Sequence, residues 1–225
     1  MIGIIGAMDV EVSNIINNIQ KIQIKKIGIY TYYQGNIEDK EVVLLKSGIG
    51  KVSSAVGAAL MIENFHPEVI INTGIAGGVS PLHTKDLCLA SKLTYGDVDA
   101  TVFDYALGQV PQMPQYYLAD SEYLNKVKNI LNDLKYDYND VLAVTSDSFI
   151  TDLNQILLKD KANIICEMEG SSIAQACHIL NTKFVSIRYI SDIINSSEHV
   201  KNYFEFETEM AQRSSEILIE VVKRI

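Results

Sequence analysis

The stretches ICEMEG at residues 165–170 and RYISD at residues 188–192 decide the fold, because each sets charged side chains directly after an apolar, strand-like run. Their charged residues are Glu167, Glu169, Arg188 and Asp192. In an open α/β sheet, ligands bind in the crevice outside the carboxyl ends of the strands. We therefore expect these four side chains to converge in one cleft, where they would form a catalytic site.

Strand-like and helix-like segments alternate along the 225 residues. The predicted strands cover residues 2–6, 27–37, 41–47, 69–72, 87–95, 141–146, 163–166 and 183–190. The predicted helices cover residues 9–20, with Asp9 as a candidate N-cap, and residues 51–64, 121–134, 171–180 and about 203–225. This alternation is typical of an α/β fold whose mostly parallel sheet is covered on both faces. No linker or repeat interrupts residues 1–225, so we expect a single domain.

Composition and charge exclude several classes of function. The formal net charge of −9 makes the chain a poor partner for nucleic acid or for an anionic membrane surface. No apolar run approaches the roughly 20 residues of a membrane helix, and residues 1–8 favour a first strand over a signal peptide. The three cysteines, odd in number and in apolar surroundings, predict reduced thiols in a cytoplasmic protein. No spacing predicts a zinc site.

Three segments between the predicted elements are candidates for ligand contact. The Gly-rich stretch 74–78 follows a strand, where a turn would let a ligand approach backbone N–H groups, although a turn without a ligand is equally compatible. Residues 47–51 (SGIGK) lack the spacing of a triphosphate-binding loop. The irregular, aromatic-rich segment 96–117 has the length of a functional or interfacial loop. Phe149 and Ile150 follow a strand, where they would either stack on a planar base or pack in the core.

The acidic residues each have two interpretations. Glu11 lies in the first turn of a predicted helix, where an acid favours the helix dipole whether or not it is catalytic. Glu167 and Glu169 would hold sugar hydroxyls or share a proton, or else form an acidic helix start. Asp192 could donate a proton if burial raised its pKa. Arg188, one of only three arginines, would either contact a substrate or form a structural ion pair.

Six segments in order resemble one known family. They are GAMDVE at 6–11, SGIGK at 47–51, NTGIAGG at 72–78, SDSFI at 146–150, EME at 167–169 and RYISD at 188–192. The chain resembles the 5′-methylthioadenosine/S-adenosylhomocysteine nucleosidases of the nucleoside phosphorylase superfamily. The resemblance implies a three-layer α/β/α fold with a central mixed β-sheet, a homodimer, and hydrolysis of the N-glycosidic bond of 5′-thioadenosines. 5′-Deoxyadenosine is a further candidate substrate. No metal and no organic cofactor are implied.

The resemblance also implies catalytic roles for particular residues. Asp192 would protonate adenine at N7, because the adenine anion is a poor leaving group, and Ser191 would position this acid. Glu11 would bind the attacking water as general base, with Arg188 nearby. Glu169 would accept hydrogen bonds from the ribose hydroxyls.

The remaining implied contacts are to the substrate alone. Phe149 would stack on adenine while the Ile150 backbone reads its edge, and Met168 would pack under the sugar. Met8 and Ile49 would line the alkylthio pocket. The other implied substrate-binding residues are Ala76, Gly77 and Glu167 in the chain itself, and Phe103 and Pro111 in loop 96–117 of a partner subunit.

Two positions depart from the family pattern, and three rival functions stay open. Ile75 stands where many members have a small hydroxyl residue, and Gly96 where a histidine is common. A phosphorylase of the same fold would need cationic groups gathered around phosphate. A hydrolase for another nucleoside, such as futalosine, would suit a more polar 5′ pocket. A non-catalytic nucleoside-binding protein would not need Glu11, Glu169 and Asp192.

Overall fold

The computed structural model describes residues 1–158, 163–196 and 199–225. Its strands are β1 (Ile2–Gly6), β2 (Gln20–Ile27), β3 (Tyr30–Ile37), β4 (Lys40–Lys46), β5 (Val69–Gly78), β6 (Leu87–Tyr95), β7 (Tyr117–Leu118), β8 (Asn139–Thr145), β9 (Ile164–Glu167) and β10 (Lys183–Ile193). Its helices are α1 (Asp9–Asn18), α2 (Lys51–Phe65), α3 (Ser121–Asp133), α4 (Gly170–Ile179) and α5 (His199–Arg224), with short 3₁₀ turns η1 (Thr101–Phe103) and η2 (Leu153–Gln155).

The strands form one mixed sheet that partly closes on itself. β5 pairs with β10, and the pairing continues through β6, β8 and β9 back to β5. We call these five strands the strand ring. From the first residues of β5, 69–72, the sheet continues through β1, β4, β3 and β2 in that order. The mixed sheet agrees with the resemblance. It is less parallel than the alternation predicted, because β3 pairs antiparallel with β2 and with β4, and two pairs within the strand ring, β10–β6 and β5–β9, are antiparallel as well.

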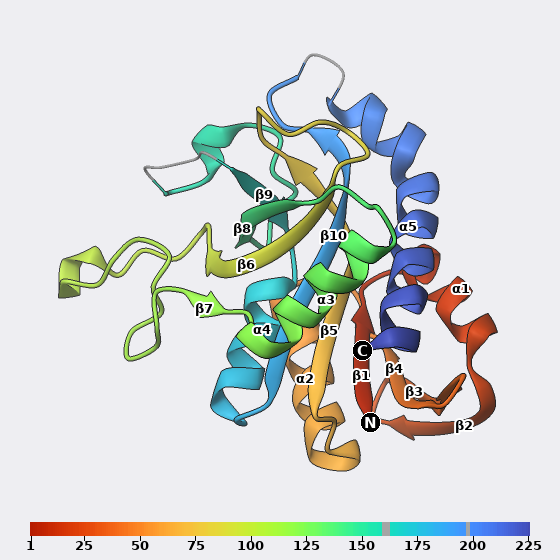
Figure 1. Cartoon of the computed structure of the whole chain (residues 1–225). Coiled ribbons are helices and arrows are strands. Elements are labelled where there is room, and N and C mark those ends of the chain that lie inside the picture. Colours follow the sequence, from red (N-terminus) through yellow and green to blue (C-terminus); the bar gives the residue numbers. More distant parts are fainter. Residues whose placement is uncertain (159–162, 197–198) are drawn as a thin grey trace.

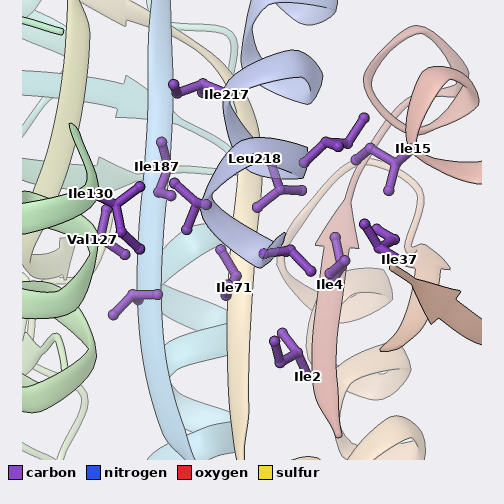
Figure 2. Packing of buried hydrophobic residues seen from close by; sticks show 14 of the residues in the cluster. Ile2, Ile4, Ile15, Ile37, Ile71, Val127, Ile130, Ile187, Ile217 and Leu218 are labelled. Carbon is purple, nitrogen blue, oxygen red and sulfur yellow. The ribbon is translucent and has the colours of Figure 1, made fainter. Parts of the chain in front are cut away.

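Helices cover both faces of the sheet, which gives the three layers (Figure 1). Side chains of α1, α3 and α5 pack on one face and those of α2 and α4 on the other. Neighbouring strand residues divide between the two cores, as Ile4 and Ile5 do, because successive side chains of a strand point to opposite faces. Figure 2 shows the first core, where Ile217 and Leu218 of α5 lie over the sheet.

The predicted helices and strands are present, but the sequence missed two strands, β2 and the two-residue β7. The sequence placed a helix up to residue 20 and a strand from residue 27, so it missed β2. The side chains of β2 are exposed along nearly its whole length, and its lysines and glutamines resemble a polar connection. Such a polar edge strand lacks the alternation of buried and exposed residues that marks a half-buried strand.

The predicted turn at residues 74–78 was wrong. These residues continue β5, because β10 pairs with β5 along its whole length and keeps the backbone extended. β10 likewise runs on to Ile193, three residues beyond its predicted end, so it includes Ser191 and Asp192. A register shift between Ile190 and Asp192 re-aims the side chains at this point.

Candidate active site

A cleft of about 680 Å³ lies where β1, β5, β9 and β10 meet the start of α1. Thirteen of the residues predicted from the sequence line it: Met8, Glu11, Ile49, Ala76, Gly77, Phe149, Ile150, Glu167, Met168, Glu169, Arg188, Ser191 and Asp192. The expectation that acids from separate strand ends converge in one cleft is confirmed.

Glu11 is buried at the start of α1 and held by backbone donors. Its Oε2 accepts hydrogen bonds from the backbone N of Ala7 (2.8 Å) and Met8 (3.0 Å), and its Oε1 from the N of Ile75 (3.0 Å). Burial raises the pKa of this carboxyl, although Arg188 and these N–H groups oppose the rise. A fixed carboxylate with a raised pKa is suited to accept a proton near neutral pH.

Asp9 is not the N-cap that the sequence predicted. The helix begins after Met8, and Glu11 reaches back to the Met8 N–H, which satisfies a donor that the helix leaves unpaired. Asp9 lies in the first turn, where its carboxylate pairs with Lys46 Nζ at 2.8 Å on the exposed surface.

Arg188 lies at the centre of the site with its side chain almost fully buried. Its Nη2 donates to Asn72 Oδ1 (2.6 Å) and Glu167 Oε2 (2.9 Å), and its Nη1 donates to the carbonyl of Ile75 (3.2 Å). Glu169 Oε2 is 4.0 Å from Nη2. The guanidinium is therefore surrounded by acceptors of the protein itself.

Glu167 is the last residue of β9 and Glu169 is the N-cap of α4, and the two make different contacts. Glu167 forms the ion pair with Arg188 and accepts the hydroxyl hydrogen of Thr145. Glu169 Oε1 accepts the backbone N–H of Gly50 (3.0 Å). Burial, and next the nearby charge of Glu167, raise the pKa of Glu169 to about 7, against the opposing effect of Arg188.

Asp192 is buried in β10 beside Ser191, whose Oγ donates to Asp192 Oδ1 at 2.6 Å. β5 approaches this carboxyl closely: a Cβ added at Gly77 would lie 3.0 Å from Asp192 Oδ2. A glycine here therefore lets the acid face the cleft across the neighbouring strand.

Aromatic and aliphatic side chains form the outer wall of the cleft. Phe149, about half exposed, packs edge-on against Tyr203 of α5, with ring centroids 5.1 Å apart. Ile150 is buried beneath it, while Ile49 is 56% exposed at the cleft. An exposed apolar wall of this kind can cover a flat base or a thioether.

The sequence missed four lining residues: Ala7, Ser148, Cys166 and Tyr203. The first three lie beside predicted site residues and follow from them. No sequence signal marked Tyr203, because it lies in the first turns of a long amphipathic helix instead of at a strand end.

Phe103 and Pro111 are not among the residues that line this cleft. Both are exposed on loop 96–117, which projects from the body of the molecule (Figure 1). Within the described residues there is no group of three His, Cys, Asp or Glu side chains that could hold a metal ion. In the same ranges no helix is long and apolar enough to cross a membrane.

Comparisons with known proteins agree with this geometry. The sequence model of the family described as "Phosphorylase superfamily" matches residues 1–225. A 5′-methylthioadenosine/S-adenosylhomocysteine nucleosidase of Halalkalibacterium halodurans is 40% identical over 228 residues, covering 100% of this chain and 98% of the relative. The nucleosidase of Listeria monocytogenes serovar 1/2a is 42% identical over 234 residues, covering 100% and 99%.

Solved structures give the same result. The nucleosidase of Neisseria meningitidis in complex with methylthio-immucillin-A superposes with a TM-score of 0.93 at 32% identity, covering 100% of this chain and 99% of that one. The Streptococcus pyogenes S-adenosylhomocysteine nucleosidase in complex with 5-methylthiotubericidin gives 0.93 at 36% identity, covering 100% and 96%. With its full length matched and its acids gathered in one cleft, the chain belongs to the 5′-methylthioadenosine/S-adenosylhomocysteine nucleosidase family of the phosphorylase superfamily.

Proposed function

We propose that this chain hydrolyses the N-glycosidic bond of 5′-methylthioadenosine and S-adenosylhomocysteine, releasing adenine and the thioribose. The observation that carries the proposal is that four buried carboxyl side chains and one buried guanidinium line the same cleft, beside an apolar wall. The names of its relatives, and the methylthio-nucleoside analogues bound in similar structures, support this substrate class. 5′-Deoxyadenosine, which shares the adenine and the ribose, is a further substrate for the same chemistry.

Departure of adenine depends on Asp192. As the glycosidic bond breaks, its electron pair moves onto the base, and a proton from Asp192 to N7 makes the leaving group neutral adenine. Ser191, at 2.6 Å, fixes the orientation of the acid. Phe149 stacks on the base, and the backbone of Ile150 reads its edge. General acid catalysis of this kind typically contributes about 10²–10⁴-fold.

Attack of water depends on Glu11. The oxocarbenium-like sugar accepts a water whose proton passes to Glu11, so the second product is the free thioribose. The raised pKa of Glu11 suits this role, and Arg188 fixes the site around it. Ile75 contributes its backbone N–H to Glu11 and its carbonyl to Arg188, so its backbone positions these two groups without a side-chain hydroxyl.

Sugar binding depends on Glu169, which accepts hydrogen bonds from the ribose hydroxyls while Met168 packs under the ring. The 5′-thioether lies against Met8 and Ile49, with Ala76 and Gly77 close to the base. Apolar side chains at this end favour a thioether over the charged or bulky 5′ group of a nucleoside such as futalosine.

Hydrolysis is favoured over phosphorolysis by the state of Arg188. Its guanidinium already donates to Asn72, Glu167 and the Ile75 carbonyl. To bind Arg188, phosphate would therefore have to displace these three acceptors. The negative charge of the surrounding carboxylates would also repel the phosphate. A non-catalytic binding protein is disfavoured because Glu11 and Asp192 are both present and buried.

The test is adenine release from methylthioadenosine, S-adenosylhomocysteine, adenosine and inosine, each with and without phosphate. We expect adenine and free thioribose from the two thioadenosines, independent of phosphate. Release that needs phosphate and yields a sugar 1-phosphate would make the protein a phosphorylase. Tight binding of methylthioadenosine without turnover would make it a binding protein.

We also propose that the protein is a cytoplasmic homodimer in which loop 96–117 completes the partner's pocket. Helices α2 and α4 form an apolar groove with Val52, Val56 and Ile179 exposed along it. Phe103 is 72% exposed on the loop. Contiguous exposed apolar side chains of this kind are typical of an interface. Cys88, Cys166 and Cys177 are all buried and no disulfide joins them, which supports a reducing compartment.

The dimer is tested by sedimentation and by mixing. Val52→Glu should lower the dimer fraction, whereas Ile29→Glu, at an 88% exposed position on the β2–β3 turn, should not. Phe103→Ala and Asp192→Asn should each have low activity alone. After random subunit exchange, their equal mixture should recover about a quarter of the parent activity, because each heterodimer contains one complete pocket. No recovery after exchange would refute the shared pocket.

A further inference from the structure

Both carboxylate oxygens of Glu167 already accept hydrogen bonds from the protein. Its Oε2 accepts from Arg188 Nη2 (2.9 Å) and from the backbone N of Glu169 (2.9 Å) and Gly170 (2.5 Å). Its Oε1 accepts from Thr145 Oγ1. A carboxylate offers about four lone-pair sites. Although Glu167 lies in the wall of the cleft, its oxygens are already engaged before a substrate arrives.

The carboxylate of Glu169, two residues further along the chain, accepts fewer hydrogen bonds from the protein than that of Glu167. The described residues give its carboxylate one hydrogen bond, from the backbone N–H of Gly50 to Oε1, and its Oε2 lies 4.0 Å from Arg188 Nη2. Acceptor positions therefore remain on Glu169 for the hydroxyls of a sugar. The two glutamates of the EME segment thus divide into one committed to the protein and one able to bind a ligand.

The contacts of Glu167 fix the position of the guanidinium. Glu167 and Asn72 both hold Nη2, so Nη1 is directed to the other side, toward the Ile75 carbonyl. A Cβ built on Gly74 would lie 2.2 Å from Glu11 Oε1 and 2.8 Å from Arg188 Nη1, which shows that the two groups flank this residue. Glu167 therefore keeps Arg188 beside Glu11 without a hydrogen bond between them in the described contacts.

We propose that Glu167 is a positioning residue that clamps the Arg188 guanidinium and the start of α4 around the reacting centre, and that it does not contact the substrate. This inference rests on the proposed hydrolysis for its kinetic consequences. Without the carboxylate, the guanidinium would move toward Glu11 and pair with it. A base paired with a guanidinium binds a proton less readily, so the chemical step slows.

The expected kinetic signature separates positioning from substrate contact. Glu167→Gln should lower kcat by about 10- to 100-fold, as a displacement near 1 Å in a catalytic site does, and leave the KM for methylthioadenosine near the parent value. Glu169→Gln should instead raise KM. The acidic limb of the pH profile should move to lower pH in Glu167→Gln, because the charge of Glu167 helps to raise the pKa of Glu169. The other ionisable groups around this pair are Glu11, Arg188, Asp192 and Tyr203 in the cleft, and Tyr95 on the other side of Glu167.

A milder pair of variants guards against loss of the fold. Thr145→Val removes the hydroxyl that donates to Glu167 while keeping the shape of the side chain, and Thr145→Ser restores the hydroxyl. We expect the valine variant to lower kcat in the same direction as Glu167→Gln, by a smaller factor, and the serine variant to recover it.

A direct measurement does not depend on turnover. The chain has three arginines, and the side chains of Arg213 and Arg224 are each 47% exposed. The guanidinium ¹⁵N–H signals of buried Arg188 should therefore stand out by slow exchange with water in the parent. They should broaden or exchange faster in Glu167→Gln and in Thr145→Val.

The outcomes are separable. If the parent releases no adenine from thioadenosines, the proposed function fails, and the ¹⁵N signals alone decide whether Glu167 holds Arg188. If the parent is active but Glu167→Gln raises KM as Glu169→Gln does, with kcat and the pH profile unchanged, Glu167 contacts the substrate and the inference is wrong. Unchanged Arg188 signals in Glu167→Gln would also overturn it.

Discussion

Replacement of Gly74 by alanine tests whether the placement of Glu11 governs the reaction. Gly74 lies in β5 with φ of +148°, a conformation that side chains of L-residues rarely adopt. A Cβ at this position would meet Glu11 Oε1 at 2.2 Å and Arg188 Nη1 at 2.8 Å. The substitution therefore acts on the proposed base and its neighbour without removing either.

The magnitude follows from these distances. Contacts of a Cβ under 3.0 Å are essentially never seen, so the Glu11 carboxylate must retreat by at least about 0.8 Å. Its hydrogen bond with the Ile75 N–H, 3.0 Å long, would then be stretched or lost. A misplacement near 1 Å in a catalytic site costs on the order of 10²-fold in rate. Backbone strain should lower the free energy of unfolding by about 1–3 kcal/mol, and therefore Tm by several degrees.

The assay compares adenine release by Gly74→Ala with that by Gly28→Ala. Gly28 also has a positive φ, +58°, but a Cβ there would meet nothing within 4 Å. Alanine at Gly28 should cost about 1–2 kcal/mol of stability and leave turnover unchanged. Circular dichroism and thermal melting show that both variants are folded at the assay temperature. If folded Gly74→Ala released adenine at the parent rate, the rate would not depend on the position of Glu11. If Gly74→Ala and Gly28→Ala lost activity equally, the loss would be an effect of lower stability.

Three further predictions concern the acid, the base-stacking residue and a titrating carboxyl. Asp192→Asn should lower kcat by about 10²–10⁴-fold while methylthioadenosine still binds, as isothermal calorimetry can measure; near-parent turnover would remove Asp192 as the acid. Phe149→Ala should weaken adenine binding by about 5- to 150-fold through lost stacking, whereas Phe204→Ala, at an exposed position outside the cleft, should not; equal effects would contradict stacking. Because the folded protein holds a proton on Glu169 up to pH of about 7 while the unfolded chain releases it near 4.5, the free energy of unfolding should fall as pH rises between these values. Glu169→Gln should reduce that fall by about 3 kcal/mol in urea titrations, and an unchanged slope would show that Glu169 does not titrate there.

The sequence located most of the residues that line the cleft and missed a few of them. Asp192 and Glu169 each follow an apolar run, and this position predicted their convergence. The two strands concerned, β9 and β10, run in opposite directions, and the two residues meet because both strands pair with Gly77 and Gly78 at the end of β5. Phe149 and Ile150 were found by the same reasoning. Each of these predictions depends on a short stretch of sequence, and the rule that ligands bind outside the carboxyl ends of strands applies to open α/β sheets in general.

Other features depend on contacts that no local pattern encodes. Tyr203 reaches the cleft from a helix that begins far along the chain, and its spacing is that of any amphipathic helix. The different contacts of Glu167 and Glu169 depend on Thr145 and Arg188, which lie 22 and 21 residues from Glu167 in the chain. The extended course of Gly74 was hidden because glycine usually signals a turn, whereas here pairing with β10 determines the backbone.

The strand ring has a consequence for how substrate preference can change. Glu167, Arg188 and Asp192 all lie on its strands, and within the ring each strand is hydrogen-bonded on both sides to its neighbours, so local opening there is costly. Ile49 and Phe149 lie on connecting segments outside it. In the proposed reaction, the acid Asp192 thus lies on the stiffest part of the molecule, whereas Ile49, at the 5′-thioether, and Phe149, at the base, lie on parts that tolerate replacement. Evolution of a new nucleoside preference can proceed in these outer segments while the protonating machinery stays unaltered.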